Sequence, residues 1–168
     1  DVNASDYRFV PVDRKTIRYG LGAVKGVGEP AVGAMLAARD KGGAFRDLFD
    51  FCERVDRRMA NRRVIEALIR AGAMDGLEGH QGLDRAQLMA TVALAMEAAE
   101  QAAANAMQGG LFDMLPEAAG AAPDFARVRP WTERERLKEE KLAIGFFLSS
   151  FDRRRLGGRF WNRQHLRG

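Results

Sequence analysis

The sequence predicts a mainly α-helical fold with a short N-terminal β-hairpin and a long alanine-rich helix. Three observations support this prediction. Apolar residues recur at helical spacing in several segments that glycines and prolines separate. Residues that favour β-strands cluster only in the first 19 positions. Residues 84–107 are rich in Ala, which has the highest helix propensity of all residues.

The N-terminal hairpin is predicted from residues 1–19. Strand-forming residues cluster at positions 7–12 and 16–19, on either side of a turn at 13–15. The chain does not begin with Met, so we expect it to belong to a longer protein. We expect the hairpin to be part of, or to pack against, a domain that precedes residue 1.

A glycine-containing turn joins a short helix to a longer helix that starts near Pro30. Exposed N–H groups at a helix N-terminus form an anion site, because they lack acceptors and the helix dipole favours negative charge. This is the pattern of a helix-hairpin-helix, a module that grips a DNA phosphate without reading bases. The alternative is a plain helix–helix turn capped by glycine. The predicted phosphate-binding residues are Lys25, Gly26, Val27 and Gly28.

A second short helix, turn and longer helix follow at residues 44–75, as a degenerate copy of the first unit. Asn61 is the predicted N-cap of the longer helix, and Gly72 the residue that ends it. Four arginines crowd the start of this helix, where the dipole disfavours cations: Arg57, Arg58, Arg62 and Arg63. The cluster indicates either an external phosphate or a solvated basic face.

The composition offers no sign of a catalytic or metal site. We interpret Cys52 as a small core residue, His80 as a loop residue, and Asp50, Glu53 and Asp56 as solvated. One Cys and two His far apart do not give the usual spacing of metal ligands. The single Cys and the lack of a signal peptide or of ~18 continuous apolar residues predict a cytoplasmic protein without a membrane partner.

The second half of the chain is predicted to be a helix, a linker and another helix. The alanine-rich helix is expected to cross the domain and then lead away from it. Residues 108–130 read as a linker that contains the apolar pair Leu111 and Phe112. This pair either anchors the chain in a partner's pocket or folds back as a helix stop. Residues 131–150 are predicted to form a helix that starts with a capping box at Thr132 and Glu135 and docks on a further domain.

The charge is unevenly distributed. Residues 151–168 contain six Arg and one Asp and carry a formal charge of +5, whereas the other 150 residues sum to −1. DNA contact in the body must therefore come from local patches and backbone amides rather than from a general positive field.

Six motifs in order make residues 2–150 resemble the region after the fingers of the bacterial DNA polymerase III alpha subunits, which are C-family replicative polymerases. The motifs are VNAS at 2–5, YGLGAVKGVGE at 19–29, DLFD at 47–50, NRRV at 61–64, AGAMD at 71–75 and EKLAIG at 140–145. The resemblance implies that residues 20–107 form a tandem helix-hairpin-helix domain. In that family the domain holds the duplex behind the active site and docks on the ring-shaped sliding clamp, the beta subunit.

The resemblance also implies roles and partners. Gln108 would hydrogen-bond at the rim of the clamp pocket, and Leu111 and Phe112 would fill it, although two glycines after Gln108 depart from stronger versions of this motif. The longer protein would be a DNA-directed DNA polymerase, a nucleotidyltransferase. Its Mg²⁺-binding carboxylates would lie in the palm, before residue 1, so we expect no catalytic residue, metal or cofactor here. The implied partners are double-stranded DNA, the sliding clamp and other polymerase III holoenzyme subunits.

Two other functions stay open. One alternative is the same region of an error-prone C-family polymerase in DNA repair, and the other is a free-standing helix-hairpin-helix adaptor that binds DNA. Residues 151–168 depart from the family, which would continue from residue 150 to an OB-fold domain, and we assign them no function.

Overall fold

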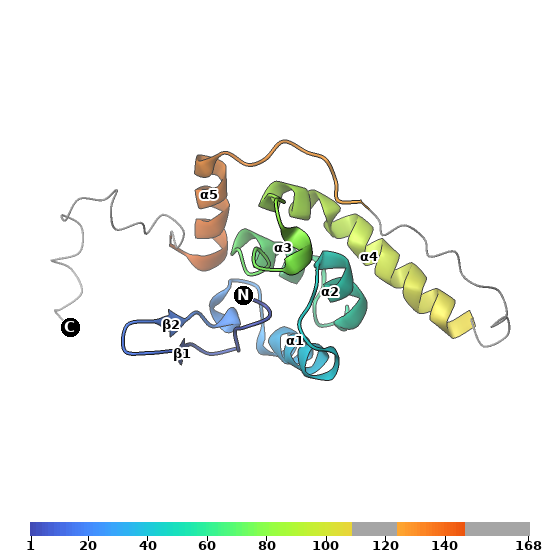
Figure 1. The fold of residues 1–168 in the computed structure, drawn as a ribbon, viewed down its shortest axis with the longest axis horizontal. Helices are drawn as coiled ribbons and strands as arrows, with labels where there is room; N and C mark the ends of the chain where they lie inside the picture. The colour runs from blue at the N-terminus through green and yellow to red at the C-terminus, as the bar shows by residue number, and fades with distance from the viewer. Residues whose placement is uncertain (109–123, 147–168) are drawn as a thin grey trace.

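A computed structural model describes residues 1–108 and 124–146 (Figure 1). The strands are β1 (Val10–Pro11) and β2 (Ile17–Arg18), which pair antiparallel. The helices are α1 (Glu29–Gly42), α2 (Leu48–Arg54), α3 (Arg62–Arg70), α4 (Arg85–Gln108) and α5 (Glu133–Ile144), with 3₁₀ turns η1 (Leu21–Ala23) and η2 (Glu78–His80). The predicted mainly α-helical fold is therefore confirmed.

One hydrophobic core joins all five helices. Helices α2 and α3 contact the inner half of α4, and α5 contacts α3. Val32 of α1, Phe51 of α2, Leu68 of α3 and Val92 of α4 are fully buried in this core, and Ile144 of α5 is 7% exposed. The core thus fixes the start of α1 and the end of α5 in one rigid body.

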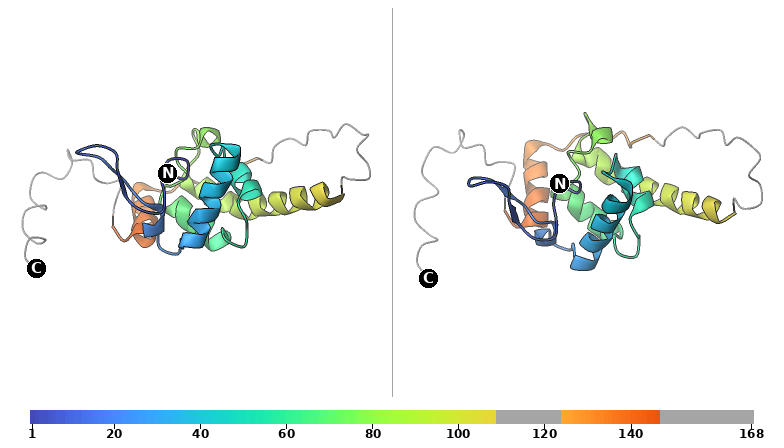
Figure 2. Two further views of the ribbon diagram at one scale, coloured as in Figure 1. Left: turned by 90° about the horizontal axis from the view of Figure 1, so that it is seen from below. Right: turned by 60° about the horizontal axis from the view of Figure 1, so that its bottom comes forward.

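The β-hairpin projects from the helices, as Figure 2 shows. Val10 pairs with Arg18, and Pro11 with Ile17. The Asp13 carboxylate closes the turn by accepting hydrogen bonds from the Lys15 and Thr16 amides at 2.7 and 2.9 Å. The predicted hairpin is present, with strands of only two residues each.

The first five residues belong to the helical core, and they change where α2 begins. Val2 is 1% exposed, and its amide donates to the Ala73 carbonyl at 2.8 Å. The Asn3 carboxamide accepts from the Phe45 amide at 2.7 Å and donates to the Phe45 carbonyl at 2.8 Å. The predicted helix start at residue 44 is wrong, because Asn3 holds Phe45 outside the helix and Asp47 caps α2 through the Asp50 amide.

Helix α4 lies across the core and then leaves it, as predicted. Leu88, Val92, Ala95 and Ala99 are buried along one face. From Ala103 to Met107 the described side chains are exposed, and the helix extends past its neighbours in Figure 1.

Helix α5 begins at the predicted capping box but ends earlier than predicted. Thr132 and Glu135 form the box, and Gly145 ends the helix with a φ of 96°. The burial of Ala143 and Ile144 shows that this end of the helix docks on the chain's own core.

Within residues 124–131, the described end of the predicted linker and the residue before α5's cap, Phe125 and Ala126 contact the helical body, whereas residues 127–130 are exposed. The Phe125 ring contacts those of Phe49 and His80, and the Ala126 amide donates to the Thr91 hydroxyl at 2.9 Å. These contacts anchor the segment that leads into α5.

Candidate nucleic-acid interface

The turn at residues 24–28 joins η1 to α1, and its two glycines play different roles. Gly26 has a φ of 85°, a conformation that residues with a Cβ rarely adopt. Gly28 has a φ of −82° and a ψ of 164°, which any residue can adopt, and it is the N-cap of α1. Because Gly28 has no side chain, no cap at this position hydrogen-bonds to the first-turn amides of α1.

Two amides of this turn are open. Lys25 donates its amide to the Ala143 carbonyl at 2.8 Å, and Val27 donates to the Val24 carbonyl at 3.0 Å. Gly26 and Gly28 are exposed, and their amides make no hydrogen bond with residues 1–108 or 124–146. The turn therefore offers two N–H groups at the positive end of a 14-residue helix, the arrangement that binds anions.

Charged side chains flank the open amides. A Cβ built on Gly145 would lie 3.7 Å from both Cε and Nζ of Lys25, so the Lys25 ammonium sits at the C-terminal end of α5. The helix dipole favours a cation there. Glu29, in the first turn of α1, is exposed and reduces the local positive field.

The contact between α5 and the turn is a part of the site that the sequence analysis missed. The carbonyl of Ala143 accepts a hydrogen bond from the Lys25 amide, and this contact fixes the turn. The available signal was Gly145, a glycine that ends a helix directly after two apolar residues.

The second hairpin has no comparable opening at its helix start. Asn61 has nearly the backbone conformation of Gly28, with a φ of −70° and a ψ of 172°, but its side chain accepts from the Val64 amide at 3.2 Å. In the preceding turn the amides of Met59 and Ala60 both donate to the Asp56 carbonyl at 2.9 Å.

The four arginines near this second hairpin are exposed and largely paired. Arg57 pairs with Glu100 of α4, Arg58 with Asp56 at 2.9 Å and Arg62 with Glu66 at 2.8 Å. Arg63 is exposed and forms no ion pair with the described residues. Exposed ion pairs of this kind contribute only about 0–1 kcal/mol, so a phosphate can displace the carboxylates.

The two sets of predicted phosphate ligands belong to different hairpins. Lys25, Gly26 and Gly28 lie at the start of α1, where the Val27 side chain is buried and the Val27 amide is already bonded to Val24. Arg62 shares Glu66 with Arg70, which pairs with Glu139 of α5 at 2.9 Å, so Arg62 lies on the side of α3 that faces α5.

The titratable groups that could suggest catalysis have structural roles. Burial raises the pKa of the Cys52 thiol to about 12, so it is not a nucleophile. Burial also raises the pKa of the Asp50 carboxyl, but hydrogen bonds from Arg46 and Arg54 outweigh this effect and hold it below its usual value. The prediction that Asp50 is solvated is wrong, because these two arginines hold it in a buried position.

His80, predicted as a loop residue, is buried in η2. Its Nε2 accepts from the Leu48 amide at 2.9 Å, and its Nδ1 lies 2.8 Å from the Met74 carbonyl. The first hydrogen bond requires an unprotonated Nε2, so the ring is neutral with its proton on Nδ1. Burial lowers the pKa of His80.

Residues 1–108 and 124–146 contain no group of three or more His, Cys, Asp or Glu that could hold a metal ion. In the same part of the chain, no helix combines the length and apolar character that a membrane span needs. Gln108 is the last residue of α4, and the predicted clamp anchors Leu111 and Phe112 lie outside the described residues.

Comparison with known proteins identifies relatives of this domain. A family model described as "Helix-hairpin-helix motif" matches residues 1–88. Over 149 residues the chain is 52% identical to DNA polymerase III subunit alpha of Neisseria meningitidis serogroup B. Over 152 residues it is 44% and 42% identical to the proteins of that name from Vibrio cholerae and Escherichia coli. Each match covers 89% of this chain but only 13% of the relative. The resemblance inferred from the six motifs is confirmed.

Proposed function

The chain belongs to the helix-hairpin-helix family, and on that premise we propose that it binds the phosphate backbone of double-stranded DNA without reading base sequence. The proposal rests on the open amides of Gly26 and Gly28 at the N-terminus of α1. Backbone N–H groups fix a protein on a duplex but carry no sequence information. Lys25, whose ammonium lies beside Gly145 at the end of α5, adds a cation next to this turn.

The chain is, in our proposal, the DNA-holding segment of a replicative DNA polymerase III alpha subunit. Three relatives of that name, 42–52% identical, support this reading over a free-standing repair adaptor or an error-prone paralogue. DNA-directed DNA synthesis, the Mg²⁺ that it requires and the contacts with other holoenzyme subunits would then belong to the cytoplasmic protein as a whole. No step of that reaction is assigned to residues of this chain.

We further propose that the chain binds a sliding clamp through Gln108, Leu111 and Phe112. The support is the exposed outer end of α4, which carries Gln108 as its last residue, and the bulky apolar pair that follows in sequence. Aliphatic and aromatic anchors of this kind supply most of the binding energy in such contacts. A clamp tether would raise the effective concentration of the polymerase at the primer end.

The DNA proposal is tested by Gly28→Asn. Gly28 already has the conformation of the Asn61 cap, and a Cβ there would lie 3.6 Å from Pro30 Cδ, an ordinary contact. The new carboxamide would accept from the Ala31 amide and occupy the place of a phosphate oxygen. We expect unchanged folding and roughly tenfold weaker duplex binding, equivalent to about 1.4 kcal/mol, by fluorescence anisotropy.

The matched control is Gly33→Asn, the same change at an exposed position of α1 with no atom within 4 Å of the added Cβ. It is expected to leave DNA affinity unchanged. Equal affinities of wild type and the Gly28→Asn variant would contradict the proposed site.

The clamp proposal is tested by Leu111→Ala combined with Phe112→Ala. Loss of both anchors is expected to cost about 2 kcal/mol or more of clamp affinity by calorimetry, with duplex binding unchanged. A control pair, Leu94→Ala with Val128→Ala, removes two apolar side chains that are each 41% exposed. Clamp affinity that is equal in the two double variants would refute this assignment.

A further inference from the structure

Three of the four acidic residues of α5 are paired with other parts of the chain: Glu135 with Arg129 at 2.8 Å, Glu139 with Arg70 at 2.9 Å and Glu140 with Arg85 at 3.3 Å. Glu140 is only 1% exposed. The fourth, Glu133, is exposed, forms no ion pair with the described residues and lines the same surface hollow as Arg134 and Lys138.

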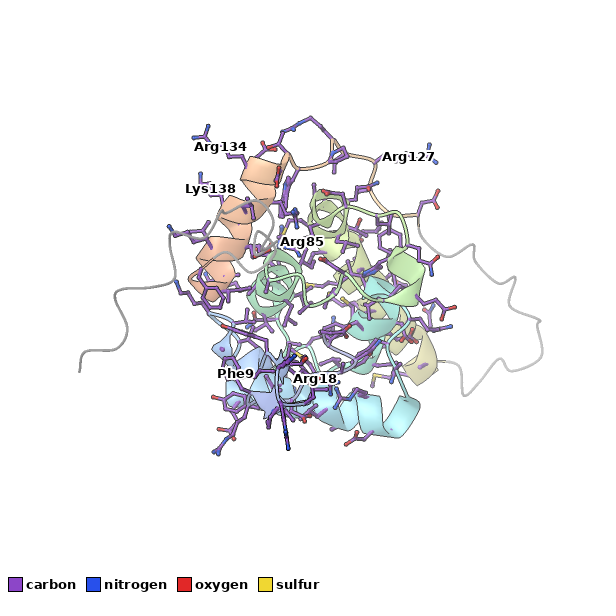
Figure 3. All side chains as sticks on the ribbon, turned by 60° about the vertical axis from the view of Figure 1, so that its left-hand side comes forward. Phe9, Arg18, Arg85, Arg127, Arg134 and Lys138 are labelled. Atoms are coloured by element: carbon purple, nitrogen blue, oxygen red, sulfur yellow. The ribbon has the colours of Figure 1, made fainter. Side chains whose placement is uncertain are left out.

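Three of the four basic residues of α5 are exposed, whereas Arg136 is half-buried. Arg134 and Lys138 are four residues apart, so they share one side of the helix. Both are exposed and form no ion pair with residues 1–108 or 124–146. In Figure 3 their side chains point away from the body of the molecule. Lys141 is exposed one turn further along the same side.

The C-terminal end of the helix that carries this basic face, defined by Arg134 and Lys138, contacts the open hairpin. The last turn of α5 accepts the Lys25 amide through the Ala143 carbonyl at 2.8 Å, next to the open amides of Gly26 and Gly28. A 12-residue helix is about 18 Å long. Phosphates of one B-DNA strand advance about 3.4 Å each along the axis, so α5 can run beside about five of them.

We propose that Arg134 and Lys138 form a second contact with the backbone of the same duplex that the hairpin holds, an inference that rests on the proposed function. The observations favour a polyanion with regularly spaced charges, because the two cations are unpaired, lie in one row and continue from a phosphate site. The Arg134 guanidinium can donate two parallel hydrogen bonds to one phosphate, and the Lys138 ammonium acts as a point charge on the next.

The test is the salt dependence of duplex binding by the full 168-residue chain. The probe is a labelled duplex of about 20 base pairs, longer than the span of α5. Arg134→Gln with Lys138→Gln removes two phosphate contacts, so the slope of log K against log salt is expected to become about 1.8 less steep. Affinity at low salt is expected to fall at least tenfold.

The charge-matched control is Lys41→Gln with Arg127→Gln. Both residues are exposed and form no ion pair with the described residues. Lys41 is at the far end of α1 from Gly28, and Arg127 lies across from Arg134 in Figure 3. This pair removes the same charge, and its slope is expected to stay close to that of wild type. Circular dichroism checks that both variants fold.

Each outcome decides between the two proposals. An equal change of slope in the two double variants would overturn the α5 contact in favour of a general charge effect, and so would an unchanged slope in the α5 variant. Neither result bears on the proposed phosphate site at the hairpin. That site is tested separately by Gly28→Asn, which removes no cation and is expected to weaken DNA affinity. Absence of duplex binding by wild type at any salt concentration would overturn both proposals.

Discussion

Helices α1 and α3 both start after a residue in extended conformation, but the two residues have opposite effects on the helix end. Asn61 fills the start of α3 with its own side-chain oxygen, which accepts from Val64. Gly28 has no such oxygen, so the first turn of α1 stays open. The two helix starts therefore differ in the cap side chain, and they differ also in the preceding turn, where the Met59 and Ala60 amides of the second hairpin both donate to the Asp56 carbonyl. Loss of the Asn61 cap is expected to cost about 1 kcal/mol.

His80 is a second case where one residue joins distant segments. Its neutral ring supplies an acceptor for the Leu48 amide at the start of α2 and a donor for the Met74 carbonyl. Protonation of Nε2 would place two donors face to face at the Leu48 amide.

The pH dependence of stability follows from this geometry. Burial lowers the pKa of His80 in the folded state, so the unfolded state binds more protons as the pH falls below the ordinary value near 6.5. The contribution of His80 to stability is therefore fully present above about pH 6.5 and decreases as the pH falls below that value. We expect the urea concentration at the midpoint of unfolding to decrease as the pH is lowered from about 7.5 to about 5.5.

Two variants check this assignment. His80→Gln is expected to be less stable at neutral pH but to show a flatter pH profile, whereas His165→Gln, at the only other histidine, should keep the wild-type slope. If the stability of the His80→Gln variant depended on pH as steeply as that of wild type, the assignment to His80 would be contradicted.

Among the elements, α5 is held to the core by a charged group. Arg85 is 8% exposed and donates to Asp75 at 2.6 Å, to Glu140 at 3.3 Å and to the Arg70 carbonyl at 3.1 Å. Gly72, in αL conformation after α3, leaves room for it, because an added Cβ would lie 2.0 Å from Arg85 Nη2. Three of the six sequence motifs, at 19–29, 71–75 and 140–145, therefore meet around the docked α5.

Removal of Arg85 is expected to destabilise the fold strongly. Arg85→Met leaves the buried Glu140 without this counter-charge, which typically costs about 3–5 kcal/mol. Adding Glu140→Leu removes the buried charge and is expected to restore most of that loss. Urea unfolding of both variants and of Glu140→Leu alone completes the double-mutant cycle. Additive effects of the two changes would show that the pair does not hold α5.

At the scale of the molecule, the core covers only part of α4. The inner half is buried under α2 and α3, whereas residues 103–107 are exposed and rich in Ala. Alanine favours the helix without adding much apolar surface, so the outer turns persist through propensity alone. The body therefore has a buried centre with one helix that extends from it.

This arrangement predicts a gradient of hydrogen exchange along α4. Amides near Leu88, Val92 and Ala95 are expected to exchange only through global unfolding, because their side chains are fully buried. Amides from Asn105 to Met107 are expected to exchange through local fraying, at rates close to those of an isolated helix end. Native-state exchange measured by NMR checks this, and uniform protection along the helix would contradict it.

The sequence by itself determined the helices, the caps at Asn61 and Thr132, the helix end at Gly72 and the family. These features depend on residues within about one helical turn of each other, so local spacing reveals them. Three features were decided only by the tertiary structure. Asn3 binds Phe45, so that α2 begins later in the chain, and His80 is buried against the Leu48 amide. The Lys25 amide donates a hydrogen bond to the Ala143 carbonyl. The tertiary structure also decided that Arg57 already has an acidic partner in Glu100 of α4, whereas the partners of Arg58 and Arg62 are local in sequence. Most of these contacts join segments far apart in the chain, and no local pattern specifies which segments the shared core brings together.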